Sequence, residues 1–215
     1  MALSKIQPAS MDLTDNYAFT GTNSITSASS GTYEQKKLAT LTASSSSTLS
    51  FTSSIDSTYN IYKFRFIEIH PSHNSNVDFG FQGSTNTGSS YGVTLTSTFF
   101  DAYHYENDSS AAVRYLTSRD LAQSTSFQPL SVNTAEADAD QHVSGELFLF
   151  DPSSTTFVKH FISTTQTASD GGSDDFSDNA YIAGYFNTTS AIDAIQFKFP
   201  SGNIDSGTIE MYGIN

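Results

Sequence analysis

Residues 60–70 read Asn-Ile-Tyr-Lys-Phe-Arg-Phe-Ile-Glu-Ile-His and form the longest strand pattern in the chain. Successive side chains of a strand point to opposite faces. One face here carries Ile61, Lys63, Arg65, Ile67 and Ile69, and the other carries Tyr62, Phe64, Phe66 and Glu68. Both faces are largely apolar, which predicts a strand in the middle of a sheet. Pro71 ends this strand, because proline has no N–H group to donate to a neighbouring strand.

Similar short segments recur to the end of the chain, separated by Gly, Ser and Asn. We expect strands over residues 37–43, 48–52, 77–82, 146–150, 156–162, 179–186, 192–199 and 207–212. The first two flank a run of four serines and are expected to form a hairpin. Residues 99–105 and 111–116 fit either short helical turns or strands. About nine strands at this spacing predict an all-β protein, an antiparallel β-sandwich with the jelly roll as the leading topology.

The composition agrees with a folded β-structure and excludes several classes of function. Of the 215 residues, 62 are Ser or Thr, but 17 Phe and 11 Tyr are enough for a core. A net charge of −13 argues against a nucleic-acid partner, because binding to phosphates depends on Lys and Arg. The absence of cysteine excludes disulfides and thiol catalysis. No apolar run is long enough for a transmembrane helix, so we expect no membrane insertion.

The first 32 residues differ from the rest. Short apolar clusters alternate there with small polar residues, and residues 21–32 are almost entirely small and polar, as in a linker or extended arm. Either this segment is an unanchored terminus, or it is an arm that docks on a neighbouring chain through Ile6, Leu13, Tyr17 and Phe19. We therefore divide the chain into an N-terminal docking arm or linker, residues 1–32, and a β-sandwich domain, residues 33–215.

Both ends of the chain resemble a known class of protein. Residues 4–8, Ser-Lys-Ile-Gln-Pro, and residues 12–22, Asp-Leu-Thr-Asp-Asn-Tyr-Ala-Phe-Thr-Gly-Thr, resemble the leader of tail-fibre and other virion structural proteins of marine tailed phages, cyanophages in particular. Residues 195–214 look like the strand–turn–strand ending common in the same proteins. Together these segments cover about a sixth of the chain.

This resemblance implies a non-enzymatic virion protein, made in the host cytoplasm and displayed on the particle exterior. Its role would be that of a capsid decoration, knob or fibre, or of a tail-fibre or adaptor subunit. The expected partners are other virion proteins and further copies of the chain, with a trimer favoured. The opening residues contain no apolar block of the length found in secretory signals, which agrees with release by lysis.

The irregular middle of the chain holds the candidate residues for glycan binding. These are Tyr91, Tyr103, Tyr105 and Tyr115, whose rings are suited to stacking on sugars. They would make the protein a receptor-binding module for host glycan or lipopolysaccharide. The competing interpretation is that these tyrosines fill a core or a seam between subunits.

An acidic, glycine-rich segment over residues 170–178 is the best candidate for a cation site. Calcium prefers six to eight oxygen ligands, which Asp170, Asp174, Asp175 and Asp178 could supply together with backbone carbonyls. The spacing is not that of an EF-hand, and a flexible acidic loop is the alternative. We expect no other cofactor.

No sequence motif supports catalysis. The Gly-x-Ser-x-Gly elbow of many serine hydrolases is missing from the sequence. Glycan hydrolysis needs a pair of carboxylates, but 22 acidic residues make such pairs inevitable by chance. We therefore assign no catalytic residues and treat a glycan hydrolase as the weakest alternative.

Overall fold

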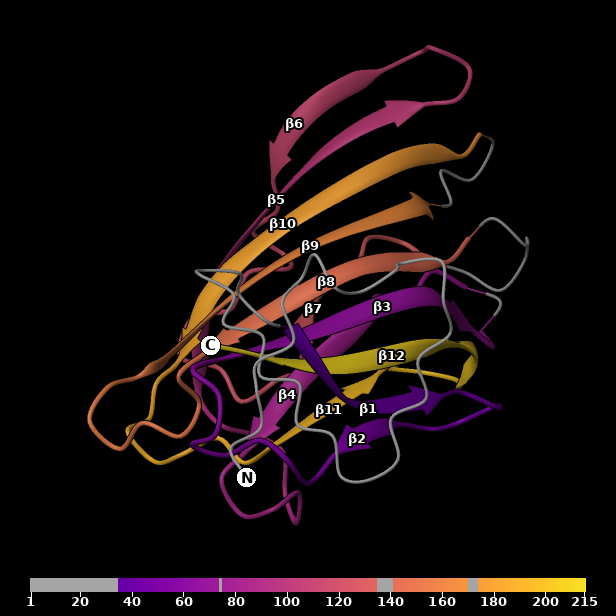
Figure 1. Ribbon diagram of the computed structural model, residues 1–215. Coiled ribbons are helices and arrows are strands. Elements are labelled where there is room, and N and C mark those ends of the chain that lie inside the picture. The colour runs from indigo at the N-terminus through magenta and orange to yellow at the C-terminus, as the bar shows by residue number, and fades with distance from the viewer. Residues whose placement is uncertain (1–34, 74, 135–140, 170–173) are drawn as a thin grey trace, which may run out of the picture. The chain divides into compact units, whose positions relative to one another are not determined.

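The computed structural model describes residues 35–73, 75–134, 141–169 and 174–215, and these residues form an antiparallel β-sandwich (Figure 1). Within them lie twelve strands: β1 (Gln35–Thr42), β2 (Leu49–Phe51), β3 (Ile61–Pro71), β4 (Gly80–Ser84), β5 (Leu95–Tyr105), β6 (Ala111–Tyr115), β7 (Gln128–Pro129), β8 (Val143–Phe150), β9 (Lys159–Ser169), β10 (Phe176–Phe186), β11 (Ala194–Lys198) and β12 (Ile204–Ile214). The larger sheet has the order β1-β12-β3-β8-β9-β10-β5-β6, and the smaller has the order β2-β11-β4-β7. The predicted all-β sandwich is confirmed, whereas the jelly-roll topology stays a prediction.

The described part of the chain contains no helix that is long and apolar enough to cross a membrane. The predicted arm residues Ile6, Leu13, Tyr17 and Phe19 lie outside the described residues.

Strand β3 lies between β12 and β8, as its two apolar faces predict. Tyr62, Phe64 and Phe66 are buried between the sheets. The alternation then changes phase, because Glu68 adopts a φ of 53° and the pairing with β8 shifts between Phe66 and Ile69. A β-bulge of this kind inserts one residue and reverses the faces beyond it. Glu68 is therefore exposed and Ile69 is buried, the opposite of what strict alternation predicts.

Phe197 of β11 lies at the centre of the core. The centroid of its ring lies 5.3–6.3 Å from the ring centroids of five other phenylalanines: Phe51, Phe64, Phe66, Phe79 and Phe81. These residues come from both sheets and from the segment that leads into β4. A second group, Phe81, Phe161 and Phe186, continues the core toward β9 and β10. The aromatic residues of the sequence thus join the two sheets.

The predicted hairpin of residues 37–43 and 48–52 is wrong. Strand β1 pairs with β12 in the larger sheet, and β2 pairs with β11 in the smaller one. The serines between them carry the chain from one sheet to the other: Ser45 has a φ of 48°, and Ser46 bridges to Ile204. The two middle segments that fitted either helical turns or strands are strands β5 and β6.

Strands β9, β10, β5 and β6 extend the larger sheet beyond β8 (Figure 1). The segment over residues 116–134 covers their inner side. Thr165 of β9 donates a hydrogen bond to the carbonyl of Leu130, and Ser169 donates one to the carbonyl of Val132. Because these hydroxyls point inward and find partners, the polar residues of β9 fit a buried face.

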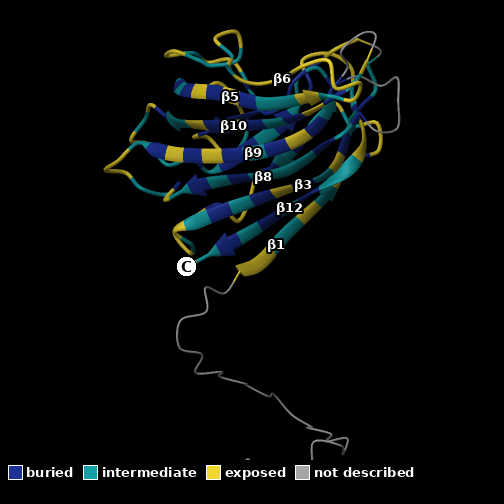
Figure 2. Ribbon diagram, turned by 90° about the horizontal axis from the view of Figure 1, so that it is seen from above, coloured by how far each residue is buried: buried dark blue, intermediate teal, exposed yellow. Residues whose placement is uncertain are grey.

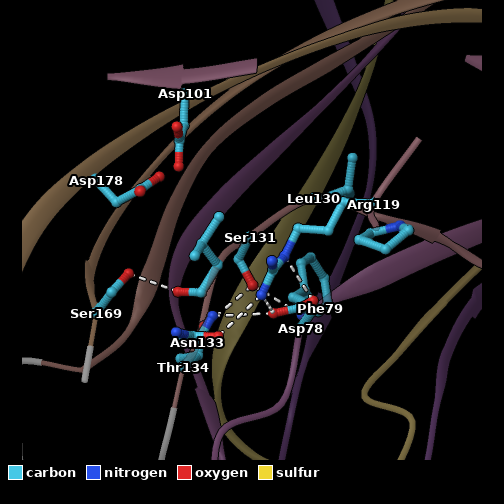
Figure 3. A network of polar contacts seen from close by, with 12 residues as sticks. Asp78, Phe79, Asp101, Arg119, Leu130, Ser131, Asn133, Thr134, Ser169 and Asp178 are labelled. Atoms are coloured by element: carbon cyan, nitrogen blue, oxygen red, sulfur yellow. Dashed lines mark hydrogen bonds and ion pairs between the residues drawn. The ribbon is translucent and has the colours of Figure 1, made fainter. Parts of the chain in front are cut away.

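The same segment is fixed at its other end by a polar network around Arg119 (Figure 3). The Nε atom of Arg119 lies 2.8 Å from Oδ2 of Asp78. Its Nη2 atom donates a hydrogen bond to Oδ1 of Asn133 at 2.9 Å. Nearby, the N–H of Phe79 donates to the hydroxyl of Ser131 at 2.8 Å. Residues 116–134 are thus bound to the segment that precedes β4.

Candidate functional site

The exposed apolar side chains of the described residues gather on one side of the molecule. Six large ones are exposed: Phe100, Val113, Tyr115, Phe157, Ile162 and Tyr181. Five of them lie on β5, β6, β9 and β10, on the side of the larger sheet that faces away from the smaller sheet. Phe157 lies in the loop between β8 and β9. We call this surface the outer apolar face.

Strand alternation produces the outer apolar face. Along β9, the buried Phe161 is followed by the half-exposed Ile162, and along β10 the buried Ile182 follows the exposed Tyr181. Figure 2 shows this alternation of buried and exposed positions along β9. Since the inward residues of these strands are covered by the smaller sheet and by residues 116–134, the outward ones are those left to solvent.

Three aromatic side chains form a row across one end of this face. Tyr115 of β6 is paired with Phe100 of β5, which is paired with Tyr181 of β10. The rings of Phe100 and Tyr181 stack, with centroids 5.0 Å apart and an angle of 8° between their planes. The hydroxyl of Tyr115 donates to Asp120 Oδ2 at 2.6 Å, and this bond raises the pKa of Tyr115. Each of the three rings in this row remains partly exposed to a partner.

Next to this row the surface contains an open hollow of about 710 Å³. Its lining is mostly apolar and comes from four strands, with side chains that include Phe150, His160, Ile162, Ala183 and Tyr185. The exposed Phe157 borders a smaller hollow that shares Phe150 and His160 with it. The outer apolar face therefore extends from β6 to the β8–β9 loop.

Beyond β8, the same side of the sheet changes from apolar to charged, and the charges are paired. Lys63 forms an ion pair with Glu146, Arg65 lies 3.0 Å from Glu210, and Lys37 lies 3.3 Å from the same carboxylate. Three cations thus meet two carboxylates on a chain whose net charge is −13. The outer side of the larger sheet carries no excess of negative charge at these positions.

Two carboxyl groups lie buried beneath the extension of the sheet (Figure 3). Asp101 of β5 and Asp178 of β10 are 0% and 1% exposed, and Arg114 of β6 bonds to both. Burial, reinforced by the neighbouring Asp101, raises the pKa of Asp178 to about 8. Its Oδ1 receives no hydrogen bond, whereas a proton on this carboxyl can be donated to Asp101. The raised pKa favours the protonated form of Asp178 at neutral pH.

This acid pair resembles the paired carboxylates of hydrolases only in composition. Both side chains are shielded from solvent, so a substrate cannot reach them in this conformation. Arg114 covers the pair, and its guanidinium lies 4.1 Å from the ring centroid of Tyr103. The cluster joins β6 to β5 and β10, which is a structural task.

The four tyrosines considered for glycan binding do not form one cluster. Tyr103 and Tyr105 are only partly exposed and contact each other and Phe176, with ring centroids 5.0–5.8 Å apart. The hydroxyl of Tyr91 is buried in a separate loop. Tyr115 alone of the four belongs to the outer apolar face.

The acidic residues considered for calcium have separate partners. Asp178 points into the buried cluster, Asp174 Oδ2 accepts a hydrogen bond from Asn107, and Asp175 Oδ1 accepts one from Gln141 at 3.4 Å. Asp170 lies outside the described residues. Among the residues that are described, no three His, Asp or Glu side chains are grouped closely enough to hold a metal ion. The calcium site stays a prediction.

Sequence reasoning missed five of the six members of the outer apolar face, namely Phe100, Val113, Phe157, Ile162 and Tyr181. Three of them stand next to another large apolar residue, in the pairs Phe99-Phe100, Phe161-Ile162 and Tyr181-Ile182. In a strand, two adjacent side chains lie on opposite faces, so one member of each pair must point outward. These pairs were a readable signal once the segments were known to be strands.

Comparison with protein-family models, curated proteins and solved structures finds no match to this chain.

Proposed function

We propose that this chain is a non-enzymatic structural protein of a tailed-phage virion. It is displayed on the particle exterior, as a capsid decoration, knob or fibre, or as a tail-fibre or adaptor subunit. The proposal combines the resemblance of the two chain ends with one structural observation, the outer apolar face. Larger patches of exposed apolar side chains on a soluble protein mark surfaces that contact other macromolecules.

The extent of the outer apolar face supports a role in assembly. An aromatic side chain presents about 150–250 Å² when fully exposed. With the exposed fractions of the six side chains, which run from 39% to 73%, the apolar area amounts to on the order of 600 Å². The largest patch of an ordinary monomer measures about 300–600 Å². The outer apolar face is thus at the upper end of what single chains leave uncovered.

The order of the strands supports the jelly-roll interpretation. Strands β1, β12, β3 and β8 face β2, β11, β4 and β7, so that the chain crosses between sheets at each successive step from β1 to β4. The pairs β5–β6 and β9–β10 are then insertions that widen the first sheet. Jelly rolls are common in viral capsid and lectin domains, but a fold by itself does not assign a function.

Docking through the N-terminal arm is the part of the proposal that one experiment tests directly. In phage that carry the full-length gene, Tyr17→Ala combined with Phe19→Ala should leave the protein folded and abolish its incorporation into particles. The matched control is Thr14→Ala combined with Thr20→Ala, which changes two residues of the same segment and neither docking aromatic. Mass spectrometry of purified particles gives the copy number. Normal incorporation of the double variant refutes arm docking, and absence of the wild-type chain from particles refutes the virion assignment.

One observation favours a second function, binding of host glycan or lipopolysaccharide. The stacked rings of Phe100 and Tyr181 and the neighbouring Tyr115 form an exposed aromatic cluster, and the parts of these rings that reach solvent can contact the apolar face of a sugar. Glycan-array binding by the purified protein, lost on Tyr181→Ala, would support this function. Release of reducing sugar would instead support the hydrolase alternative.

A further inference from the structure

We infer that the outer apolar face is the contact between two copies of this chain, related by a two-fold axis. The inference rests on the proposed function and names the partner of the same surface. Sheet faces that carry apolar side chains are stable when a second sheet packs on them at about 10 Å. The inner side of β9, β10 and β5 is already covered: Thr165 and Ser169 of β9 and Ser97 of β5 bond to residues 116–134, and Phe161 of β9 and Phe186 of β10 pack on Phe81 of the smaller sheet. The outer side has no cover within the described chain.

The apolar area fits a partner of protein size. A standard interface buries about 800 Å² on each side. The six exposed side chains supply on the order of 600 Å² of this. The half-buried Phe148, Phe150 and Tyr185 continue the surface around them. A core of this size, enriched in aromatic residues and surrounded by polar groups, matches the composition of protein interfaces.

Charge balance makes a second copy an acceptable partner despite the net charge of −13. Two acidic chains repel each other unless the surfaces that meet are locally neutral. On the outer side of the larger sheet, Lys63 pairs with Glu146, and Arg65 and Lys37 pair with Glu210. The ammonium of Lys63 also lies 5.2 Å from the ring centroid of Phe148, where the charged part meets the apolar part. At these positions two such surfaces can approach without bringing unpaired carboxylates together.

The position of the exposed side chains favours a two-fold contact over the trimer expected from the sequence. All six lie on or beside one sheet face, so only contact between two of these faces buries apolar area on both partners. Such an isologous contact closes as a dimer. Three copies around an axis would bring their sheet faces together only along a narrow strip.

Sedimentation equilibrium of the full-length protein tests the inference. We expect twice the chain mass at micromolar concentration. Ile162→Glu, placed at the centre of the outer apolar face, should raise the dissociation constant by on the order of 100-fold, because a charge there loses its water on contact. Val113→Glu is the second variant, at the edge strand. Ser53→Glu, an exposed position in the β2–β3 loop, is the control with the same added charge and should stay dimeric.

Each alternative occupant gives a different result. A monomeric wild type, a trimer, or a dimer that resists both Ile162→Glu and Val113→Glu overturns the inference. If the chain's own arm occupied this face, Tyr17→Ala with Phe19→Ala would turn a monomer into a dimer, which also overturns it. A dimer that is absent from phage particles refutes the proposed function but leaves this inference standing. A monomer that is present in particles refutes this inference but leaves the proposed function standing.

Discussion

Replacing Asp178 by Asn should make the protein more stable at neutral pH. Asp178 is 1% exposed and lies against Asp101, and its pKa is raised to about 8. In the unfolded chain the same carboxyl has its ordinary pKa of about 3.8. The folded protein therefore holds a proton that the unfolded chain releases, and stability falls as the pH rises from about 4 to about 8. Asn is neutral at every pH and can donate to Asp101 through Nδ2.

The size of the effect follows from the pKa difference. Each pH unit between the two pKa values costs about 1.36 kcal/mol. Between pH 4 and pH 7 the ionisation of this one carboxyl in the unfolded chain lowers the free energy of unfolding by about 4 kcal/mol. The variant Asp178→Asn does not have this loss, because Asn does not ionise. The gain of the variant over wild type should thus be small at pH 4, rise to a few kcal/mol at pH 7 and level off above pH 8.

Urea unfolding at one-unit steps from pH 4 to pH 9 measures this difference. Asp205→Asn is the control, because Asp205 is an exposed aspartate of β12. Its difference from wild type should stay within about 0.5 kcal/mol at every pH. A gain for Asp178→Asn that does not depend on pH, or a variant less stable than wild type at pH 7, would refute the account of the buried acid pair.

Three further substitutions test the aromatic core, the β-bulge of β3 and the attachment of residues 116–134. Phe197→Ala should lower the free energy of unfolding by about 3–5 kcal/mol in urea titrations, because it opens a cavity among five aromatic rings. Gly207→Ala should cost about 1–3 kcal/mol in thermal unfolding, because Gly207 has a φ of 109° and a Cβ there would lie 2.4 Å from a backbone oxygen of β3. Arg119→Ala should cost about 2 kcal/mol and speed hydrogen exchange across residues 116–134, since it leaves a carboxylate unpaired. For the predicted cation site, the measurement is the melting temperature after EDTA and again after added calcium, and no shift in either direction would contradict the site.

The controls for these changes are also available in the chain. Ser53→Ala, at an exposed site outside the outer apolar face, should cost less than about 0.5 kcal/mol. A loss as large as that of Phe197→Ala would contradict the described core. If hydrogen exchange across residues 116–134 is no faster in Arg119→Ala than in wild type, the ion pair does not hold this segment in place. A rise in melting temperature with calcium would establish a cation site.

The sequence predicted the all-β class and the central position of β3, because hydrophobic alternation is a local property. It failed where a single backbone conformation changed the outcome. The φ of 53° at Glu68 reverses the faces of the last part of β3, and nothing in the alternation of Ile67, Glu68 and Ile69 announces it. The supposed hairpin failed because a serine run can either turn back in one sheet or cross to another, and long-range pairing with β12 and β11 decides between them.

The candidate site was only partly predictable for a related reason. Tyr115 was selected as an aromatic residue in an irregular region, but its neighbours Phe100 and Tyr181 come from strands 15 to 66 residues away in sequence. The same holds for Asp178. Its place in an acidic segment suggested a cation ligand, whereas pairing with β5 places it against Asp101 and Arg114. Register between distant strands, which the sequence does not display, determines both arrangements.

The central claim is that the outer apolar face is covered by another chain in a phage particle. A cryo-electron-microscopy reconstruction of purified particles tests it most directly. The account predicts density for this sandwich on the particle exterior, with Phe100, Ile162 and Tyr181 of two copies in contact across a two-fold axis. A reconstruction in which these three side chains face solvent, or in which the chain is absent, would contradict it.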